Sequence, residues 1–299
     1  MLRPMRTEPD RQQQHYVPKF YLKHFANPST RRLQILDFDL MTLLAPRGPR
    51  GLCSAAYFYA VETGHADETS QEVEKYLGEC ETAFAHDLPT IIANILNPNQ
   101  RIDDMEKRVL ASFMSMIWVR GQQAREVATQ QQKITLGYES LVVNDLRRRL
   151  RPDAELKDVP PRIDNTWHLH LLSKHIGTYA RRFHAQHWNV WVSRGAGTFV
   201  TSCDPIATVT PKYEGRIPPS FQRLTHYFAL TPEISIEAVR PHNTGKRLRR
   251  RTLFAGDKDA VDQRNRIIAA RTPRYVYAPH RKPLEDLLQA FGPTTETRP

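Results

Sequence analysis

The apolar positions of the chain follow two different spacings. In the first half they recur every three or four residues, which is the spacing of one face of an α-helix. The longest such stripe consists of Val73, Leu77, Cys80, Phe84, Leu88, Ile91 and Ile95. It predicts a long helix that Pro89 kinks or splits. A second helix is expected after a cap at Asp103 or Asp104, and a third over residues 134–150.

Alternation of apolar and polar residues, which is typical of strands, appears on both sides of these helices. Near the N-terminus, residues 33–39 and 55–61 predict a hairpin, preceded by a short helix that Pro18 opens. After a helix over 167–184, residues 188–193 and 198–202 predict a second hairpin around Gly195 and Gly197. The remaining expected elements are strands at 225–230, 234–239 and 274–277 and helices at 258–270 and 283–292.

These elements predict an α+β fold. The first half is helical with a small N-terminal hairpin, and the second half combines a mixed antiparallel sheet with helices. We expect one domain over residues 15–292, with a sub-domain break near 151–163, where three prolines interrupt the pattern. Residues 1–14 and 293–299 are expected to be flexible ends.

Charge is the strongest signal in the composition. The chain has 43 Lys and Arg residues against 32 Asp and Glu, a net charge of +11. Arg clusters occur at 147–151, 181–182 and 246–251. Because Arg binds phosphate with a planar fork of donors, this balance favours nucleic acid as a partner. The alternative is that the clusters are solvated surface.

The composition also indicates the cellular compartment that we expect for the protein. No apolar run approaches the roughly 20 residues that span a bilayer, so no membrane partner is expected. Cys53, Cys80 and Cys203 are widely separated and odd in number, which matches neither a disulfide framework nor a zinc spacing. A reducing cytoplasm is the simplest interpretation.

His15 is the first candidate for chemistry. It lies in the stretch Gln14-His15-Tyr16-Val17-Pro18, in which Pro18 fixes the direction of the chain and the aromatic residues that follow, Tyr21 among them, supply burial. An imidazole that titrates near neutrality can act as a general acid or base. The alternative is a histidine that forms part of an N-terminal anchor.

A second candidate is the end of the strand Thr198–Ser202. Thr201, Ser202, Cys203 and Asp204 follow an apolar run and precede Pro205. Strand ends are where rigid scaffolds place reactive groups, although Thr, Ser and Asp before Pro also form turns. Cys203 has no visible activating partner and is expected to be a small buried residue.

Arg120 is the third candidate because it lies on the apolar face of its predicted helix. A buried charge must be paired or must reach into a cleft. Glu74, in the preceding helix, is an available partner, and a clamp on a substrate phosphate is the functional alternative.

Cofactor motifs are missing. His168, His170, His175, His184 and His187 do not fall on one helix face together with an acid, so no metal site is expected from them, and a divalent metal elsewhere is left open. The chain has no Gly-rich phosphate loop, no HExxH motif and no nucleophile elbow. No cofactor is predicted.

Four ordered motifs resemble one bacterial family. They are His15-Tyr16-Val17-Pro18 with Tyr21-Leu22; Phe58-Tyr59 followed by Glu74; Thr201-Ser202-Cys203-Asp204-Pro205 followed by Leu230-Thr231-Pro232; and Asn265 before Arg274-Tyr275-Val276-Tyr277. Together they are similar to the family called domain of unknown function 4238, over residues 13–279. The family usually carries Asp directly after the Ser, whereas here Cys203 intervenes. The resemblance therefore identifies a family but implies no activity for this chain.

Three functions remain open. The first is a phosphodiesterase or nuclease in a defence or mobile-element setting, with His15, Ser202 and Asp204 as catalytic residues and Arg120, Thr201, Tyr21 and Glu74 binding the substrate. The second is a non-catalytic nucleic-acid-binding or regulatory module in which the motifs maintain the fold. The third is a small-molecule enzyme with an apolar pocket beneath the aromatic N-terminal segment. The sequence does not indicate the oligomeric state.

Overall fold

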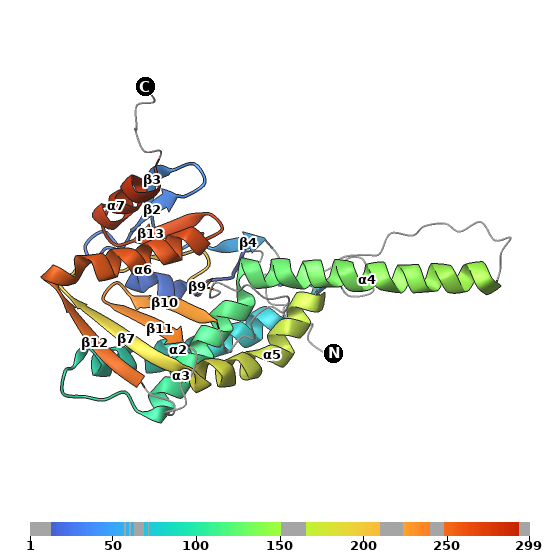
Figure 1. Cartoon of the computed structure of the whole chain (residues 1–299), viewed down its shortest axis with the longest axis horizontal. Helices are drawn as coiled ribbons and strands as arrows, with labels where there is room; N and C mark the ends of the chain where they lie inside the picture. Colours follow the sequence, from blue (N-terminus) through green and yellow to red (C-terminus); the bar gives the residue numbers. More distant parts are fainter. Residues whose placement is uncertain are drawn as a thin grey trace, which may run out of the picture.

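In the computed structural model, a five-stranded sheet lies between two layers of helices (Figure 1). The structure describes residues 13–56, 58–59, 61–62, 69–70, 72–150, 166–209, 224–239 and 248–292. The strands, in spatial order, are β12 (Leu248–Phe254), β7 (His187–Arg194), β11 (Ile234–Val239), β10 (Thr225–Thr231) and β9 (Ile206–Val209). All neighbouring pairs are antiparallel except β12 and β7, which are parallel.

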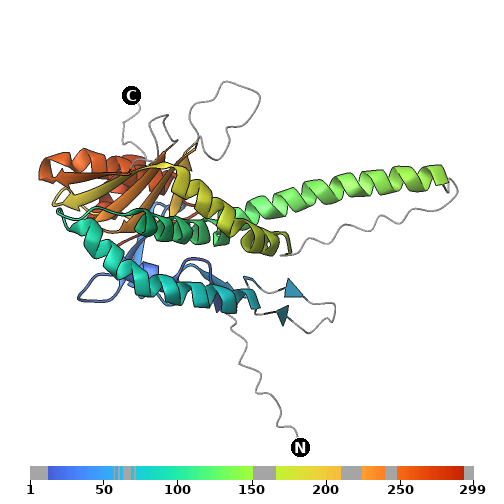
Figure 2. The same ribbon diagram turned by 90° about the horizontal axis from the view of Figure 1, so that it is seen from below.

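Helix α6 (Lys258–Arg271) covers one face of this sheet, and α2 (Glu72–Leu96), α3 (Asp104–Arg120) and α5 (Thr166–Ala185) lie on the other (Figures 1 and 2). Side chains of β7 alternate between the two faces of the sheet, and Trp188, Val190 and Val192 are all buried on one face. A sheet with such an apolar face packs against helices. Helix α3 is the centre of the core, and Phe113 and Ile117 are fully buried. Asp103 begins this helix with a capping box shared with Glu106.

A second sheet contains β3 (Thr42–Arg47), β2 (Leu33–Asp37), β13 (Tyr275–Ala278) and β8 (Thr201–Ser202), in that order, with α7 (Lys282–Phe291) packed on it (Figure 1). β8 and β9 are consecutive in sequence but belong to different sheets. The three residues between them, Cys203, Asp204 and Pro205, therefore form the corner at which the chain passes from one sheet to the other.

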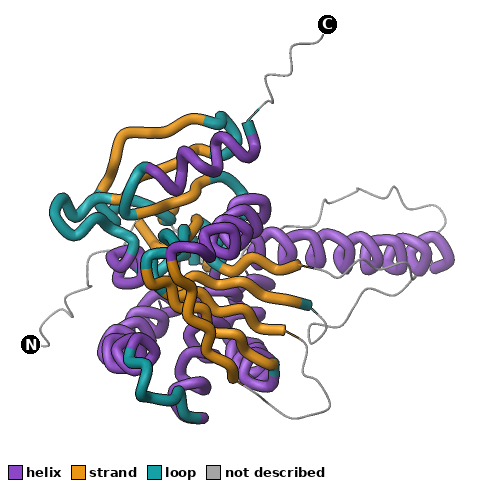
Figure 3. The backbone as a smooth tube through the Cα atoms, turned by 60° about the vertical axis from the view of Figure 1, so that its left-hand side comes forward, coloured by secondary structure: helices purple, strands orange, loops and turns teal. Residues whose placement is uncertain are grey.

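The N-terminal segment is tied to the body. β1 (Gln13–His15) pairs antiparallel with β4 (Ser54–Ala56), and α1 (Lys19–His24) follows at once. A small antiparallel pair is formed by β5 (Val61–Glu62) and β6 (Thr69–Ser70). Helix α4 (Gln122–Leu150) follows α3 after Gly121 alone and extends away from both sheets (Figure 3).

The α+β class and most predicted helices are confirmed. The long helix expected from the stripe Val73 to Ile95 forms as α2 without a break at Pro89. Helix α4 begins at Gln122, well before the expected position 134. The sequence did not reveal this early start because residues 122–133 are rich in Gln and carry little apolar periodicity. Gln13 and Gln14, assigned to the flexible end, form β1. The expected break at 151–163 lies outside the described residues.

The chain forms a small N-terminal hairpin as expected, but the strand pairs predicted for both hairpins were wrong. β2 pairs with the nearer segment β3, because Met41 adopts a left-handed backbone (φ 47°) and the Asp37 carboxylate accepts the Leu40 N–H to form a tight turn. After β7, residues 198–200 do not return along it. The side chain of Asn265 in α6 satisfies their backbone instead, since it accepts from Val200 N–H and donates to the Thr198 carbonyl. β9 and β12 were not predicted.

Candidate functional site

Arg120 lies at the C-terminal end of α3 and its side chain is fully buried. Each of its three nitrogen atoms donates a hydrogen bond. Nη1 contacts Oε1 of Glu81 at 2.6 Å, Nε contacts the Tyr59 hydroxyl at 3.1 Å, and Nη2 contacts the His15 carbonyl. Burial opposes its charge, but Tyr59 and Glu81 raise the pKa of Arg120 above its ordinary value. The guanidinium is therefore charged and joins β1, α2 and the turn at Tyr59 to α3.

The last carbonyls of α3 also lie in the protein interior. The Nε2 atom of His168, in α5, lies 3.0 Å from the Val119 carbonyl, and the Tyr59 hydroxyl lies 3.4 Å from the Arg120 carbonyl. Burial lowers the pKa of His168 to about 4, so near neutral pH this imidazole is uncharged and donates from Nε2. These contacts satisfy carbonyls that a helix end leaves without partners.

His15 contributes its backbone more than its ring. Its carbonyl accepts from Arg120 and lies 3.2 Å from the Tyr59 hydroxyl. The ring is half-buried, and its Nε2 atom is buried with no hydrogen-bond partner among the described residues. Burial, assisted by Arg120 and Lys19 and opposed by Glu81, lowers the pKa of the imidazole. A neutral imidazole can accept a proton, but nothing in the described contacts orients it.

Tyr21 and Thr201 meet in the core. The Tyr21 hydroxyl lies 2.6 Å from Thr201 Oγ1 and donates to the Ala229 carbonyl, also at 2.6 Å. Both side chains are fully buried, and burial raises the pKa of Tyr21 far above its usual range. This bond joins α1 to β8 and β10, which belong to different sheets.

Ser202 is occupied by turn formation. Its hydroxyl donates to the Asp204 carbonyl at 2.6 Å and accepts the Asp204 N–H at 3.2 Å, and the side chain is fully buried. Cys203 is buried as expected, and burial raises its pKa, so the thiol stays protonated. The residues at this strand end stabilise the corner between the sheets.

Asp204 lies against the start of α4. Its side chain accepts a hydrogen bond from the backbone of Gln123, in the first turn of that helix. A Cβ atom on Gly121 would lie 3.4 Å from Oδ1, which is ordinary van der Waals contact, so the carboxylate lies directly beside the junction of α3 and α4. Oδ2 is buried with no partner among the described residues. Burial raises the pKa of this carboxyl to about 7, although the Gln123 bond opposes the shift.

Glu74 is half-buried on α2, two turns before Glu81, and its charge acts on Tyr59, whose pKa burial raises to about 12. The structure thus gathers His15, Arg120 and Glu74 around Tyr59. Burial raises the pKa of Tyr16 above its usual range, and Cys53 adds to the shift. The sequence did not indicate that Tyr59 and Glu81 would be the partners of Arg120.

No group of three or more His, Cys, Asp or Glu side chains among the described residues is placed to hold a metal ion. His184 instead contacts Asp104 at 2.9 Å. No helix in the described part of the chain is long and apolar enough to cross a membrane.

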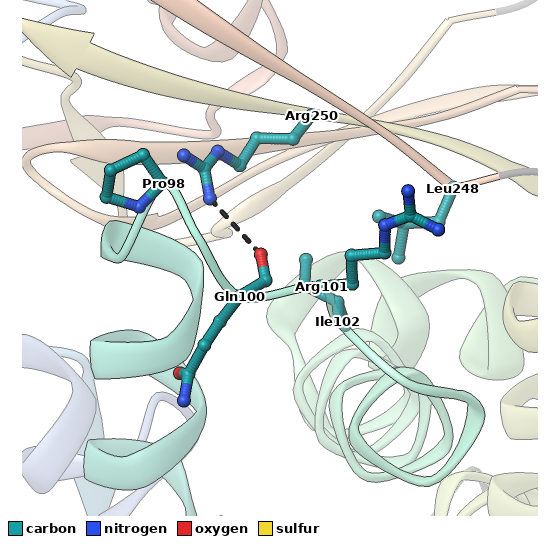
Figure 4. A pocket seen from close by; sticks show the side chains of 6 residues that line it. All are labelled: Pro98, Gln100, Arg101, Ile102, Leu248 and Arg250. Atoms are coloured by element: carbon teal, nitrogen blue, oxygen red, sulfur yellow. Dashed lines mark hydrogen bonds between the residues drawn. The ribbon is translucent and has the colours of Figure 1, made fainter.

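A solvent-filled groove lies elsewhere, between the α2–α3 loop and the edge strand β12. Its volume is about 390 Å³, and it is lined by Pro98, Gln100, Arg101, Ile102, Leu248 and Arg250 (Figure 4). Arg250 Nη1 reaches across from β12 and donates to the Asn97 carbonyl at 2.5 Å and the Gln100 carbonyl at 3.5 Å. The Arg101 side chain is exposed and makes no hydrogen bond with a described residue. The sequence signal for this site was the basic run at 246–251.

Fold and site together define an α+β protein whose sequence motifs are concentrated in a buried polar cluster and whose open groove is basic. In comparisons with known proteins, residues 13–282 match the family described as "Protein of unknown function (DUF4238)", and the chain belongs to this family. No curated protein and no solved structure matches it.

Removing the Arg120 side chain tests its structural role. We expect Arg120→Met to lower the free energy of unfolding by about 3–5 kcal/mol, because Glu81 and the His15 carbonyl lose their buried donor. Arg108→Met is the matched control, since Arg108 forms an exposed pair with Asp104 within α3 and should cost less than about 1 kcal/mol. Urea denaturation measures both. Equal costs for the two variants would contradict the assignment.

Asp204 predicts an unusual dependence of stability on pH. The unfolded carboxyl ionises near pH 3.8, whereas the folded one keeps its proton until about pH 7. Because the folded state binds more protons in this window, the free energy of unfolding should fall as pH rises from 4 to 7, by up to about 4 kcal/mol. Denaturation at several pH values measures this slope. Asp204→Asn should lack that part of it, and an identical slope in the variant would show that Asp204 does not contribute.

Proposed function

We propose that this protein binds nucleic acid through the groove between β12 and the α2–α3 loop, and that its family motifs maintain the fold. The observation that carries the proposal is the exposed Arg101 guanidinium, which has no hydrogen-bond partner among the described residues, in a groove of about 390 Å³ that Arg250 also lines. An arginine beside an open groove is suited to a phosphate, because its planar fork matches phosphate oxygens.

The groove is rigid enough to hold a ligand. Arg194 of β7 and Arg250 of β12 donate to the Leu96 and Asn97 carbonyls at the end of α2, where a helix favours positive charge. These bonds fix the α2–α3 loop against the sheet edge. On the far side of Arg101, Asp103 and Glu106 satisfy each other's backbone in the capping box of α3. Arg101 is therefore left available on a loop that is held in place.

The charge of the whole chain supports the same proposal. A net charge of +11 creates a long-range attraction toward polyanions, which accelerates their encounter with any basic groove. β12 adds Arg249 and Arg251, which are exposed. These two arginines add positive charge to the same strand, on the face opposite the groove.

The contacts of the motif residues favour this proposal over a phosphodiesterase. A phosphate clamp needs free donors, yet all three nitrogen atoms of Arg120 are occupied within the protein. Ser202 is committed to its own turn, and Asp204 is only 4% exposed. A substrate could reach these groups only after the fold had opened.

A small-molecule pocket beneath the N-terminal aromatic residues has less support because that region is filled. The Tyr21 ring stacks on Phe228, with ring centroids 5.5 Å apart, and contacts Phe113 edge-on at 6.0 Å. Tyr21 and Phe25 are fully buried. The aromatic residues thus supply the packing that holds α1 in place.

Charge reversal in the groove tests the proposal. We expect Arg101→Glu to weaken binding of a labelled oligonucleotide and to make the slope of log affinity against log salt shallower by about 1. Arg32→Glu is the matched control, because this substitution changes the net charge by the same amount. Arg32 is exposed and directly precedes β2, which lies away from β12 (Figure 1). Fluorescence anisotropy between about 50 and 200 mM salt measures both slopes. Equal losses would mean that the groove has no special role.

Substitution of His15 distinguishes a protein that only binds nucleic acid from one that cleaves it. We expect His15→Ala to retain nucleic-acid binding and to cost about 1 kcal/mol of stability or less, because its carbonyl, not its ring, contacts Arg120. Tyr59→Phe is the contrasting variant: it removes the hydroxyl that Arg120 contacts and should cost about 1–3 kcal/mol. Urea denaturation and anisotropy measure the two effects. A nuclease activity that His15→Ala abolishes in folded protein would refute the non-catalytic assignment.

A further inference from the structure

The edge strand β12 carries two different kinds of side chain that suit a nucleic acid. Arg249, Arg250 and Arg251 are consecutive, so they alternate between the two faces of the sheet. Phe254 ends the strand, and its aromatic side chain is 63% exposed. The strand is paired only on its β7 side, and its other edge is open among the described strands.

Arg249 and Arg251 point to the face opposite the groove. They lie beside Asn189 and Trp191 of β7 in the register of the two strands. Their positions are two residues apart, which on a strand is about 7 Å, a separation that suits consecutive phosphates of an extended nucleic-acid strand. Both side chains are exposed, and neither makes a hydrogen bond with a described residue.

The surface beneath these arginines is held rigid. The Arg251 guanidinium lies 5.0 Å from the Trp191 ring centroid, and Arg264 of α6 stacks on the same ring at 3.5 Å. Trp191 Nε1 donates to Glu237 at 3.1 Å, and the Glu237 carboxylate also accepts from Asn189 and Tyr227. Arg264 lies 3.6 Å from the same carboxylate and offsets its charge. Arg249 and Arg251 are left as an excess of positive charge.

From this arrangement we propose that the nucleic acid bound at β12 is single-stranded. Its phosphates contact Arg249 and Arg251 on one face of the strand and Arg101 and Arg250 in the groove on the other, and one base stacks on Phe254. This inference rests on the proposed function. Basic residues that follow the backbone, together with an exposed aromatic ring for a base, are the combination that single-strand-binding surfaces use.

The shape of this sheet edge prevents a duplex from contacting the arginines on both faces of β12 at the same time. The α2–α3 loop, to which Arg250 is bonded, lies against one face of β12, so the strand does not stand free (Figure 4). A duplex is stiff over about 150 base pairs and cannot fold around a single strand edge into a groove of this volume. A single strand bends at every nucleotide and can contact both faces.

Anisotropy with one fluorescent oligonucleotide, as a single strand and as a duplex, tests the inference. We expect the single strand to bind at least about ten-fold more tightly than the duplex at the same salt. Phe254→Ala should weaken single-strand binding by about ten-fold without changing its salt slope, since stacking releases no counterions. Tyr138→Ala, which removes an exposed aromatic ring on α4, is the matched control and should have no effect.

The arginines give an independent readout. Arg249→Ala with Arg251→Ala should reduce the salt slope for the single strand by about 1.4, which is two phosphate contacts at 0.7 each. Arg32→Ala with Arg281→Ala is the control of equal charge. If the duplex binds as tightly and Phe254→Ala changes nothing, the single-strand inference is wrong, while the groove can still bind nucleic acid. If the wild-type protein binds neither form even at about 20 mM salt, the proposed function itself fails.

Discussion

The buried guanidinium of Arg120 is the constraint on which the rest of the structure depends. A charge that is fully removed from solvent needs a partner for each of its nitrogens, and this chain supplies the partners from three separate segments: His15 of β1, Tyr59 and Glu81. Only α2, which carries Glu81, is next to α3 along the chain, whereas His15 and Tyr59 come from segments farther away in the sequence. Satisfying one side chain thus fixes how the N-terminal strand and α2 approach the central helix.

A second constraint follows directly along the chain. Gly121 separates α3 from α4, and the carboxylate of Asp204 lies directly beside it. The same aspartate belongs to the corner between the two sheets and accepts from the first turn of α4. The two ends of the junction between α3 and α4 are therefore bound to different parts of the molecule, the N-terminal segment at Arg120 and the sheet corner at Asp204. These two contacts hold the residues on either side of the junction, beyond which α4 extends away from the body (Figure 1).

The sequence predicts the elements well where a period of three to four or of two persists, as in α2, β10 and β11. It predicts strand pairing poorly, because pairing depends on side chains far away, such as Asn265, which satisfies the backbone of residues 198–200. The role of Arg120 illustrates the same limit. Glu74 and Glu81 are seven residues apart and lie on one face of α2, so only the register of α2 against α3 brings Glu81 into contact. Arg120 donates to the backbone carbonyl of His15 and not to its ring. A backbone contact of this kind cannot be predicted from the identities of the side chains.

The composition of β12 makes the proposed binding surface hard to recognise in the sequence. Three consecutive arginines indicate a solvated loop, yet Leu253 and the parallel pairing with β7 hold them in a strand. Charge at a sheet edge also prevents other strands from pairing there. An exposed Phe254 is not needed to prevent this pairing. Its apolar ring increases the risk of aggregation, whereas the charged side chains reduce it. The combination of positive charge and an exposed ring on one edge is therefore better explained by a ligand that needs both.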